Sequence, residues 1–230
     1  MPKKKKEIEP EKDIVVERPT VKVWKTSITK GELAELPAET FKGKIQIIND
    51  EESASAAAKK LSAEGLIGFD TETKPSFKRG ERHFVALLQL STIHESFLFR
   101  LNNIGLPKCI ADILEDENIL KIGLSIHDDF LSLKKKFDIN PQGFIDLQQY
   151  VKNYNIADNS LSRIYGILFG KRISKGQRLT NWEAPTLTNS QQEYAALDAL
   201  ACLNIYNHLQ EKGFDYQKSK YYREFDEPAN

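Results

Sequence analysis

Apolar runs of strand length dominate the chain from residue 41 to about residue 101. They cover residues 44–48, 66–70, 84–92 and 95–101. Short runs rich in Ile, Leu, Val and Phe between polar breaks are typical of strands. Only a brief polar link separates the last two runs, so we expect an antiparallel hairpin there.

Helical spacing of apolar residues appears between and after these runs. The expected elements are a helix over 50–65, a helix over 109–116, a strand over 119–126, a helix over 128–137, a strand over 143–147, helical structure from about Gln148, and a long helix from Ser190 to about Lys212. Antiparallel strands followed by strands that alternate with helices predict an α/β fold. Its sheet is expected to be mixed, antiparallel and then parallel, with helices on both faces.

The pattern divides the chain into three parts. Residues 1–40 are charged, contain proline and lack sustained periodicity, so we expect a flexible arm. The globular domain is expected over 41–213, and a tail over 214–230. Four lysines at positions 3–6 suit a nucleic-acid or targeting patch, but the acids that follow at once favour a solvated tail.

Composition adds limits on compartment and partner. The 230 residues contain 33 basic and 33 acidic side chains, so net charge indicates no particular partner. The cysteines, Cys109 and Cys202, lie far apart and match no ligand spacing, as expected of reduced thiols. Neither a membrane-spanning run nor the apolar segment of a signal peptide is present. We therefore expect a soluble, cytoplasmic protein.

Two acids, Asp70 and Glu72, follow an apolar run in the stretch GLIGFDTET. Side chains in a strand alternate between faces, so both carboxylates point the same way. Like charges beside a core repel one another and lose hydration. A divalent cation such as Mg²⁺ or Mn²⁺ would cancel this repulsion through oxygen ligands. The alternative is a pair of exposed acids at a strand end.

A second acidic place lies in KIGLSIHDDF, where a helix begins near His127. Asp128 and Asp129 fall in its first turn, where acids cap helices and complement the dipole. At least one of them is expected to do only that. Asp129 lies four residues before Leu133, which should face the core, so Asp129 is the better candidate for a site. Asp146 ends a strand and is expected to cap a helix.

The third acidic place lies on the long helix, in YAALDA. Tyr194 and Asp198 are four residues apart and therefore share one helix face. The alanines and leucines around them allow close packing against a sheet. An aspartate in such a place needs a partner, which could be Tyr194 itself or a site.

A basic stretch, GKRISKGQRLTNW, covers residues 170–182 without an acid. Lys175 and Arg178 in it are candidates for contact with the phosphates of a nucleic acid. Trp182 could stack on a base or simply anchor the loop. The alternative for the whole stretch is a solvated loop.

Together these motifs resemble the DEDD superfamily of 3′–5′ exonucleases, and within it the DEDDy branch. The family's Asp-x-Glu motif matches Asp70 and Glu72 in FDTET. Its second motif, a glycine after a strand and then an aspartate four before a leucine, matches KIGLSIHDDFLSL and assigns Asp129. Its third, Tyr-x-x-x-Asp, matches Tyr194 and Asp198.

The resemblance runs from about Phe41 to Lys212. Within the branch, ETKPSFKRGERHFVALLQLST and NWEAPTLTNSQQEYAALDA are similar to the exonuclease domain of Werner-type helicases and, more distantly, to ribonuclease D. It implies a ribonuclease H-like fold, in which three antiparallel strands are followed by parallel ones.

The resemblance also implies a two-metal mechanism with Mg²⁺ or Mn²⁺. Asp70 would bridge the ions, Glu72 and Asp198 would complete the first site, and Asp129 would support the second. Tyr194 would orient the attacking water, and the product would be a nucleoside 5′-monophosphate.

The implied partner is a nucleic acid with a free 3′ end, with DNA favoured. Trimming of RNA ends, as in ribonuclease D, is the first alternative, because a 2′-hydroxyl contact cannot be read from a sequence. A non-catalytic nucleic-acid-binding domain of the same fold is the second, although such domains usually lose one of the acids. A sugar-phosphate or nucleotide phosphatase has no motif in its favour.

Overall fold

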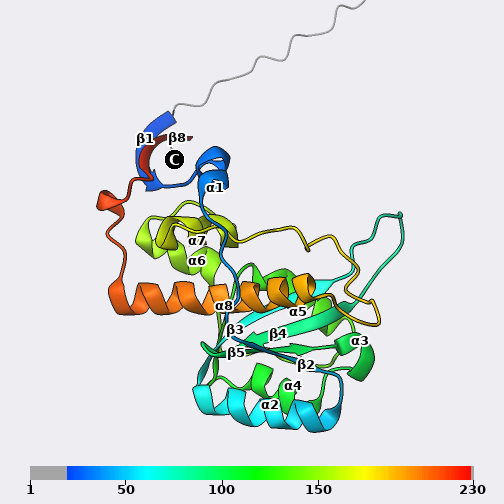
Figure 1. The fold of residues 1–230 in the computed structure, drawn as a ribbon. Coiled ribbons are helices and arrows are strands. Elements are labelled where there is room, and N and C mark those ends of the chain that lie inside the picture. The colour runs from blue at the N-terminus through cyan, green and yellow to red at the C-terminus, as the bar shows by residue number, and fades with distance from the viewer. Residues whose placement is uncertain (1–19, 229–230) are drawn as a thin grey trace, which may run out of the picture.

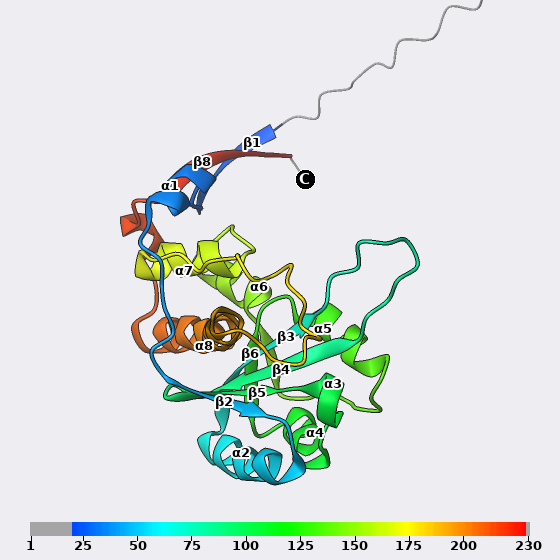
Figure 2. The ribbon, with the colours of Figure 1, turned by 45° about the vertical axis from the view of Figure 1, so that its right-hand side comes forward.

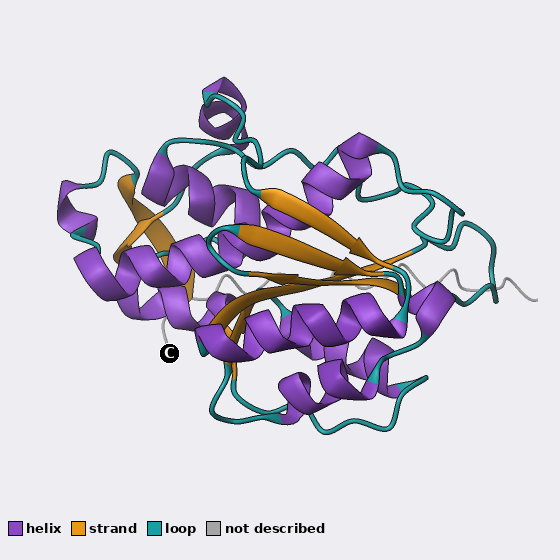
Figure 3. Ribbon diagram, turned by 60° about the horizontal axis from the view of Figure 1, so that its bottom comes forward, coloured by secondary structure: helices purple, strands orange, loops and turns teal. Residues whose placement is uncertain are grey.

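Six strands form the central mixed sheet of the computed structural model, which describes residues 20–228. The strands are β2 (Lys44–Ile48), β3 (Leu66–Thr73), β4 (Val85–Ser91), β5 (Glu95–Phe99), β6 (Leu120–Gly123) and β7 (Phe144–Asp146). Figure 3 shows them as one layer between helices. Across the sheet they follow the order β2-β5-β4-β3-β6-β7.

Strand directions confirm the predicted mixed sheet. β3, β4 and β5 pair antiparallel, and β6 and β7 continue parallel to β3. β2 lies parallel to β5 at the opposite edge. β3 therefore lies inside the sheet, between an antiparallel and a parallel neighbour. Strands with helices on both faces are buried on both sides, which explains why β4 is apolar along nearly its whole length.

Helices cover both faces of this sheet (Figures 1 and 2). The helices are α1 (Lys30–Glu35), α2 (Glu51–Glu64), α3 (Leu101–Ile104), α4 (Lys108–Glu115), α5 (Ile126–Lys134), α6 (Leu147–Tyr150), α7 (Leu161–Phe169) and α8 (Asn189–Lys212), with short 3₁₀ turns at Val151–Tyr154 and Tyr216–Lys218. α2 and α4 pack on one face, and α8 lies on the other, with α6 and α7 beyond it.

The long helix α8 begins and packs as its sequence predicts. Thr188 caps it in a capping box with Gln191, which satisfies two free backbone N–H groups. Its alanines face the sheet, and they allow a close approach at Gly68 of β3. A Cβ atom built on Gly68 would lie 2.0 Å from the carbonyl oxygen of Ala199. The backbones of α8 and β3 are therefore in contact at this point.

Some predicted boundaries were wrong. The strand expected over 119–126 ends at Gly123 and the next helix starts at Ile126, because Ser125 adopts a left-handed conformation with φ 61° and turns the chain. The helical prediction from Gln148 onward is wrong for residues 171–188, which contain no helix. This loop holds the predicted basic stretch.

The predicted arm and tail differ most from the structure. The lysines at 3–6 lie outside the described residues. Within the described residues, β1 (Thr20–Thr26) pairs antiparallel with β8 (Tyr222–Pro228), in what were predicted to be an arm and a tail. Figure 2 shows this ribbon beside α1, apart from the main sheet. Charged residues on both strands hid the pairing, because its partners are some 200 positions apart and cross-strand ion pairs such as Lys25 with Glu227 use those charges.

The helices and the two cysteines bear on the expectations about membrane spans and thiols. No helix within residues 20–228 combines the length and apolar character needed to cross a membrane. Cys109 and Cys202 are both free thiols. Cys202, which lies on α8, is buried in the core.

We predict that Gly68→Ala lowers the free energy of unfolding by about 3 kcal/mol, because the added methyl group must displace the backbone of α8 from β3. Urea denaturation measures this change. Gly31→Ala is the matched control, since its Cβ would find no atom closer than 4.0 Å, and it should leave stability unchanged or slightly higher. Equal stability of Gly68→Ala and the wild type would contradict the close contact.

Candidate active site

β3 supplies two acids where it extends beyond its parallel neighbour. Its pairing with β6 ends at Gly68, whereas its pairing with β4 continues to Thr73. Asp70 and Glu72 lie in this extension and, two positions apart, share one face of the strand. That face is turned toward α8. The local sequence therefore places two carboxylates at the rim of the sheet rather than in its middle.

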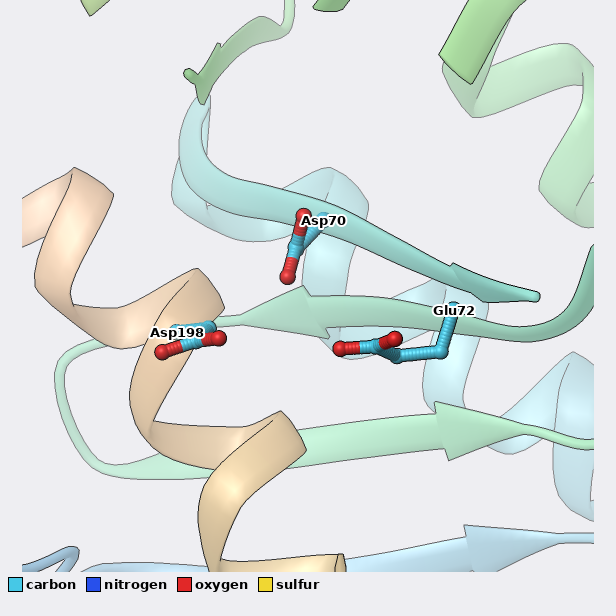
Figure 4. A group of neighbouring side chains, drawn as sticks. All are labelled: Asp70, Glu72 and Asp198. Carbon is cyan, nitrogen blue, oxygen red and sulfur yellow. The ribbon is translucent and has the colours of Figure 1, made fainter. Parts of the chain in front are cut away.

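α8 brings the third acid, Asp198, to the same place. Asp198 directly precedes Ala199, whose carbonyl touches β3 at Gly68. Oxygen atoms of Asp70, Glu72 and Asp198 lie within 4.8 Å of one another. Figure 4 shows the three carboxylates turned toward a common centre, two from the strand and one from the helix. The structure thus brings together three of the four predicted acids.

Burial makes this group electrostatically unfavourable when all three acids are charged. Burial, followed by the charges of Asp198 and Glu72, raises the pKa of Asp70 well above its usual range. Burial and the charge of Asp198 raise the pKa of Glu72 to about 9. Burial raises the pKa of Asp198 to about 7, although the Tyr194 hydroxyl and Lys175 lower it. Without a counter-charge, the folded protein holds protons here at neutral pH.

The donor set fits a hard divalent cation. It consists of carboxylate oxygens alone, which Mg²⁺ and Mn²⁺ prefer. Asp198 is 7% exposed, and its Oδ1 atom has no hydrogen-bond partner among the described residues. A buried acceptor without a partner is costly. A cation between the three acids would satisfy this oxygen and remove the repulsion together.

Asp129 lies beside this group but is not part of it. Its Oδ1 accepts a hydrogen bond from the hydroxyl of Thr71, the residue of β3 that lies between Asp70 and Glu72. Asp129 lies close enough to the group for its charge to raise the pKa of both Asp70 and Glu72. Burial raises the pKa of Asp129 to about 6, while this hydrogen bond lowers it. Asp128 is exposed, which agrees with the choice of Asp129 as the site candidate.

The turn before α5 fixes the position of Asp129. Asp146 caps α6 by accepting a hydrogen bond from the Gln148 N–H, which confirms its predicted capping role. The same Oδ1 accepts a bond of 3.0 Å from the Ser125 N–H. Ser125 has a positive φ, and this bond holds it in that conformation. Sequence analysis missed the roles of Thr71 and Ser125, since neither belongs to an acidic motif.

Tyr194 lies on the face of α8 that carries Asp198, and Trp182 supports it from behind. The two aromatic rings have centroids 6.0 Å apart. Trp182 has no exposed surface and packs in a cluster with Leu87, Leu98 and Ala195. Its predicted role in stacking on a base is therefore wrong, and the alternative, that it anchors the loop, describes the structure.

A buried arginine provides a second anchor for the same loop. Arg100 is 2% exposed, and its guanidinium donates hydrogen bonds to the carbonyl oxygens of Ala184 and Pro185. These bonds fix the segment just after Trp182. No signal in the sequence separates Arg100 from an ordinary surface residue at a strand end, because its partners are backbone atoms 84 and 85 positions away.

The exposed part of the loop carries the basic residues. Lys175 and Arg178 line a pocket of about 410 Å³ together with the three clustered acids and Tyr194. Asp129 is not among its lining residues. Lys171, from the same basic stretch, instead pairs with Glu39 at 2.9 Å. The prediction of basic groups beside the acidic site therefore agrees with the positions of Lys175 and Arg178.

The fold and the acids define a class: an α/β protein whose mixed sheet carries a group of acids that could hold a cation, where its inner strand meets the covering helix α8. A family model described as 3′-5′ exonuclease matches residues 45–213. This match covers most of the chain, and the chain belongs to the 3′–5′ exonuclease family.

A relative agrees with this assignment, and two solved structures share the fold. The mouse bifunctional 3′-5′ exonuclease/ATP-dependent helicase WRN is 33% identical over 156 residues, which cover 65% of this chain and 11% of that protein. The Nibbler EXO domain of Aedes aegypti superposes with a TM-score of 0.68 at 22% identity, over 79% of this chain and 97% of that one. Escherichia coli RNase D gives 0.65 at 24% identity, over 73% and 44%. The part of this chain that matches WRN covers only 11% of the length of that relative.

We predict that metal-free protein loses stability as pH rises from about 5 to 9. The folded-state pKa values of Glu72 and Asp198 are about 9 and 7, above their ordinary values, so the folded state binds more protons than the unfolded state in this range. Mn²⁺ should replace those protons at pH 8. At 100 times its Kd it would stabilise by about 2.7 kcal/mol, which is roughly 5–10 °C in Tm.

Thermal unfolding with and without Mn²⁺ at pH 5 and pH 8 measures this effect. The shift should be small at pH 5, where protons compete for the acids. Asp198→Asn should abolish the shift at pH 8, whereas Asp128→Asn, which alters an exposed acid nearby, should keep it. An equal shift in Asp198→Asn and the wild type would show that Mn²⁺ binds elsewhere.

Proposed function

We propose that this chain is a metal-dependent 3′–5′ exonuclease that removes nucleoside 5′-monophosphates from the 3′ end of nucleic acid, with DNA favoured. One observation carries the proposal: three carboxylates from β3 and α8, two of them buried, converge within 4.8 Å in a chain of the exonuclease family. Exposed basic residues border the same pocket. Acids alone would repel a phosphodiester, so cleavage there requires cations between the acids and the substrate.

Asp70, Glu72 and Asp198 would hold the first of two divalent ions, Mg²⁺ or Mn²⁺. Asp129, which Thr71 keeps beside the group, would support the second. When bound, such ions lower the pKa of the attacking water and stabilise the leaving 3′ oxygen. The contribution of the protein is to hold four carboxylates at fixed positions on a strand and two helices. Their mutual repulsion in the metal-free state is what makes ion binding favourable.

Tyr194 would orient the attacking water rather than deprotonate it. Burial, followed by the charges of Asp198 and Glu72, raises the pKa of Tyr194 far above its usual value. Its hydroxyl therefore keeps its proton at neutral pH and can act as a hydrogen-bond donor or acceptor to water. Contact with the buried Trp182 fixes the ring direction.

Lys175 and Arg178 would contact substrate phosphates at the mouth of the pocket. Both are exposed, and each lowers the pKa of an acid in the group, Asp198 and Glu72 respectively. Such contacts are insensitive to base sequence. The phosphate chemistry is the same for DNA and RNA, which differ by the 2′-hydroxyl.

We predict that the wild-type protein shortens 5′-labelled oligonucleotides from the 3′ end in Mn²⁺ or Mg²⁺, and not in EDTA. Single-stranded DNA, a recessed duplex and a matched RNA compared on one gel would rank the substrates. Asp70→Asn and Asp198→Asn should each lower the rate roughly a thousandfold or more, because each removes a charged ion ligand from a site worth several kcal/mol. Full activity in either variant would exclude the proposed site.

Asp129 and Asp128 offer an internal comparison of neighbouring acids. Asp129→Asn should lower kcat roughly tenfold to a hundredfold, because Asp129 lies beside the group and is held by Thr71. Asp128→Asn should stay within about twofold, as expected of an exposed surface acid. Steady-state kinetics on the best substrate would test both. The reverse order of effects would assign the second ion to Asp128.

A further inference from the structure

Two further pockets adjoin the acidic site, and they differ in charge. One, of about 500 Å³, shares Ser160, Ser162, Ile173, Ser174 and Lys175 with the site pocket. Its basic lining residues are Lys30, Arg163, Arg172 and Lys175, and we call it the basic groove. Its described lining includes no acid.

The other neighbouring pocket, of about 310 Å³, shares Ser174 and Tyr194 with the site pocket. It is lined by Glu39 and Glu193, and no basic side chain is among its described lining residues. A polyanion leaving the acidic site would therefore meet cations in one direction and carboxylates in the other. Even with Glu39 paired to Lys171, Glu193 remains as a repulsive charge on that side.

Most of the positive charge of the basic groove is uncompensated. Within residues 20–228, no ion pair includes Lys30, Lys175 or Arg172. Arg172 is instead fixed by a hydrogen bond from its Nε to the Leu36 carbonyl oxygen. Arg163 pairs with Asp158 at 2.8 Å. Three of the four cations are thus free to meet an anion.

α1 is docked firmly enough to make Lys30 a fixed part of this groove. A Cβ on Gly166 of α7 would lie 2.9 Å from Leu33 and 3.1 Å from Leu36, so α1 packs closely over this glycine. Ile28, just before α1, is fully buried, and its N–H donates to Asp158. α1 lies outside the residues that match the family model, which begin at 45.

We infer that the basic groove receives the phosphates of the single strand immediately 5′ to the nucleotide being removed, and that α1 extends this path through Lys30. The inference rests on the proposed function and deepens it. The terminal phosphodiester occupies the acidic pocket, and the strand continues past Lys175 toward Arg172 and Lys30. Cations on phosphates hold the strand without reading its bases.

Lys30→Glu tests the groove, with Lys59→Glu, at an exposed position of α2, as the control of equal charge change. The substrates are a single-stranded 12-mer DNA and the p-nitrophenyl ester of thymidine 5′-monophosphate, which is too short to reach α1. Reversing one charge near a phosphate costs roughly tenfold in affinity. Lys30→Glu should therefore raise KM for the 12-mer roughly tenfold, with a much smaller effect on the ester.

Binding measured without hydrolysis separates this inference from the proposed function. Fluorescence anisotropy of the labelled 12-mer in EDTA should show weaker binding to Lys30→Glu and a salt slope lower by about one, with Lys59→Glu equal to the wild type. Equal binding by Lys30→Glu and Lys59→Glu would overturn the groove, even if the protein cleaves DNA. Weaker binding by Lys30→Glu alone, in a protein that cleaves neither substrate, would support the groove and overturn the proposed exonuclease.

Discussion

The contact between α8 and β3 at Gly68 is the constraint on which the acid group depends. Asp198 reaches Asp70 and Glu72 only because no side chain stands between helix and strand at the neighbouring residue, Ala199. A helix held further out would separate the third carboxylate from the other two. The apolar burial of α8 must therefore offset the repulsion that it creates, because burial and neighbouring charges both raise the pKa of Asp70 and Glu72 and so disfavour the charged group.

Local order predicted the strands and the long helix. That acids from the strand and the helix meet in one group was expected only from the resemblance to the exonuclease family, and the structure brings three of them together. Alternation along β3 places Asp70 with Glu72, and helical spacing places Asp198 with Tyr194. Features that depend on distant partners were not predictable in this way. The burial of Trp182 depends on residues of β4 and β5, and β1 finds its partner only at the far end of the chain. Thr71 donates a hydrogen bond to the Asp129 side chain, and Arg100 donates one to the Pro185 carbonyl oxygen. No local sequence pattern reveals either partner.

The loop over residues 171–188 has an anchored half and an exposed half. Trp182 and the carbonyls held by Arg100 fix its second half to the core. Its first half leaves Lys175 and Arg178 exposed near the acids. They lower the pKa of Asp198 and Glu72, yet neither is in any ion pair found within residues 20–228. A direct ion pair would fill the place of a metal ion and occupy the cation that a phosphate needs. Because the basic side chains lie near the acids without pairing with them, the acids stay available for metal ions and the cations for phosphates.

The same separation shows how a chain of zero net charge could hold the proposed nucleic-acid substrate. Local potential, not total charge, governs such binding. Carboxylates concentrate where ions would neutralise them, and cations line only one of the two ways out of the pocket. In the proposed path, the direction of a bound strand would be set by side chains from two separate parts of the chain, the loop and α1. Since α1 is held by its packing over Gly166, the path depends on an element that precedes the family's own matched region. A relative with the same acids but without α1 would keep the chemistry and lose part of this direction.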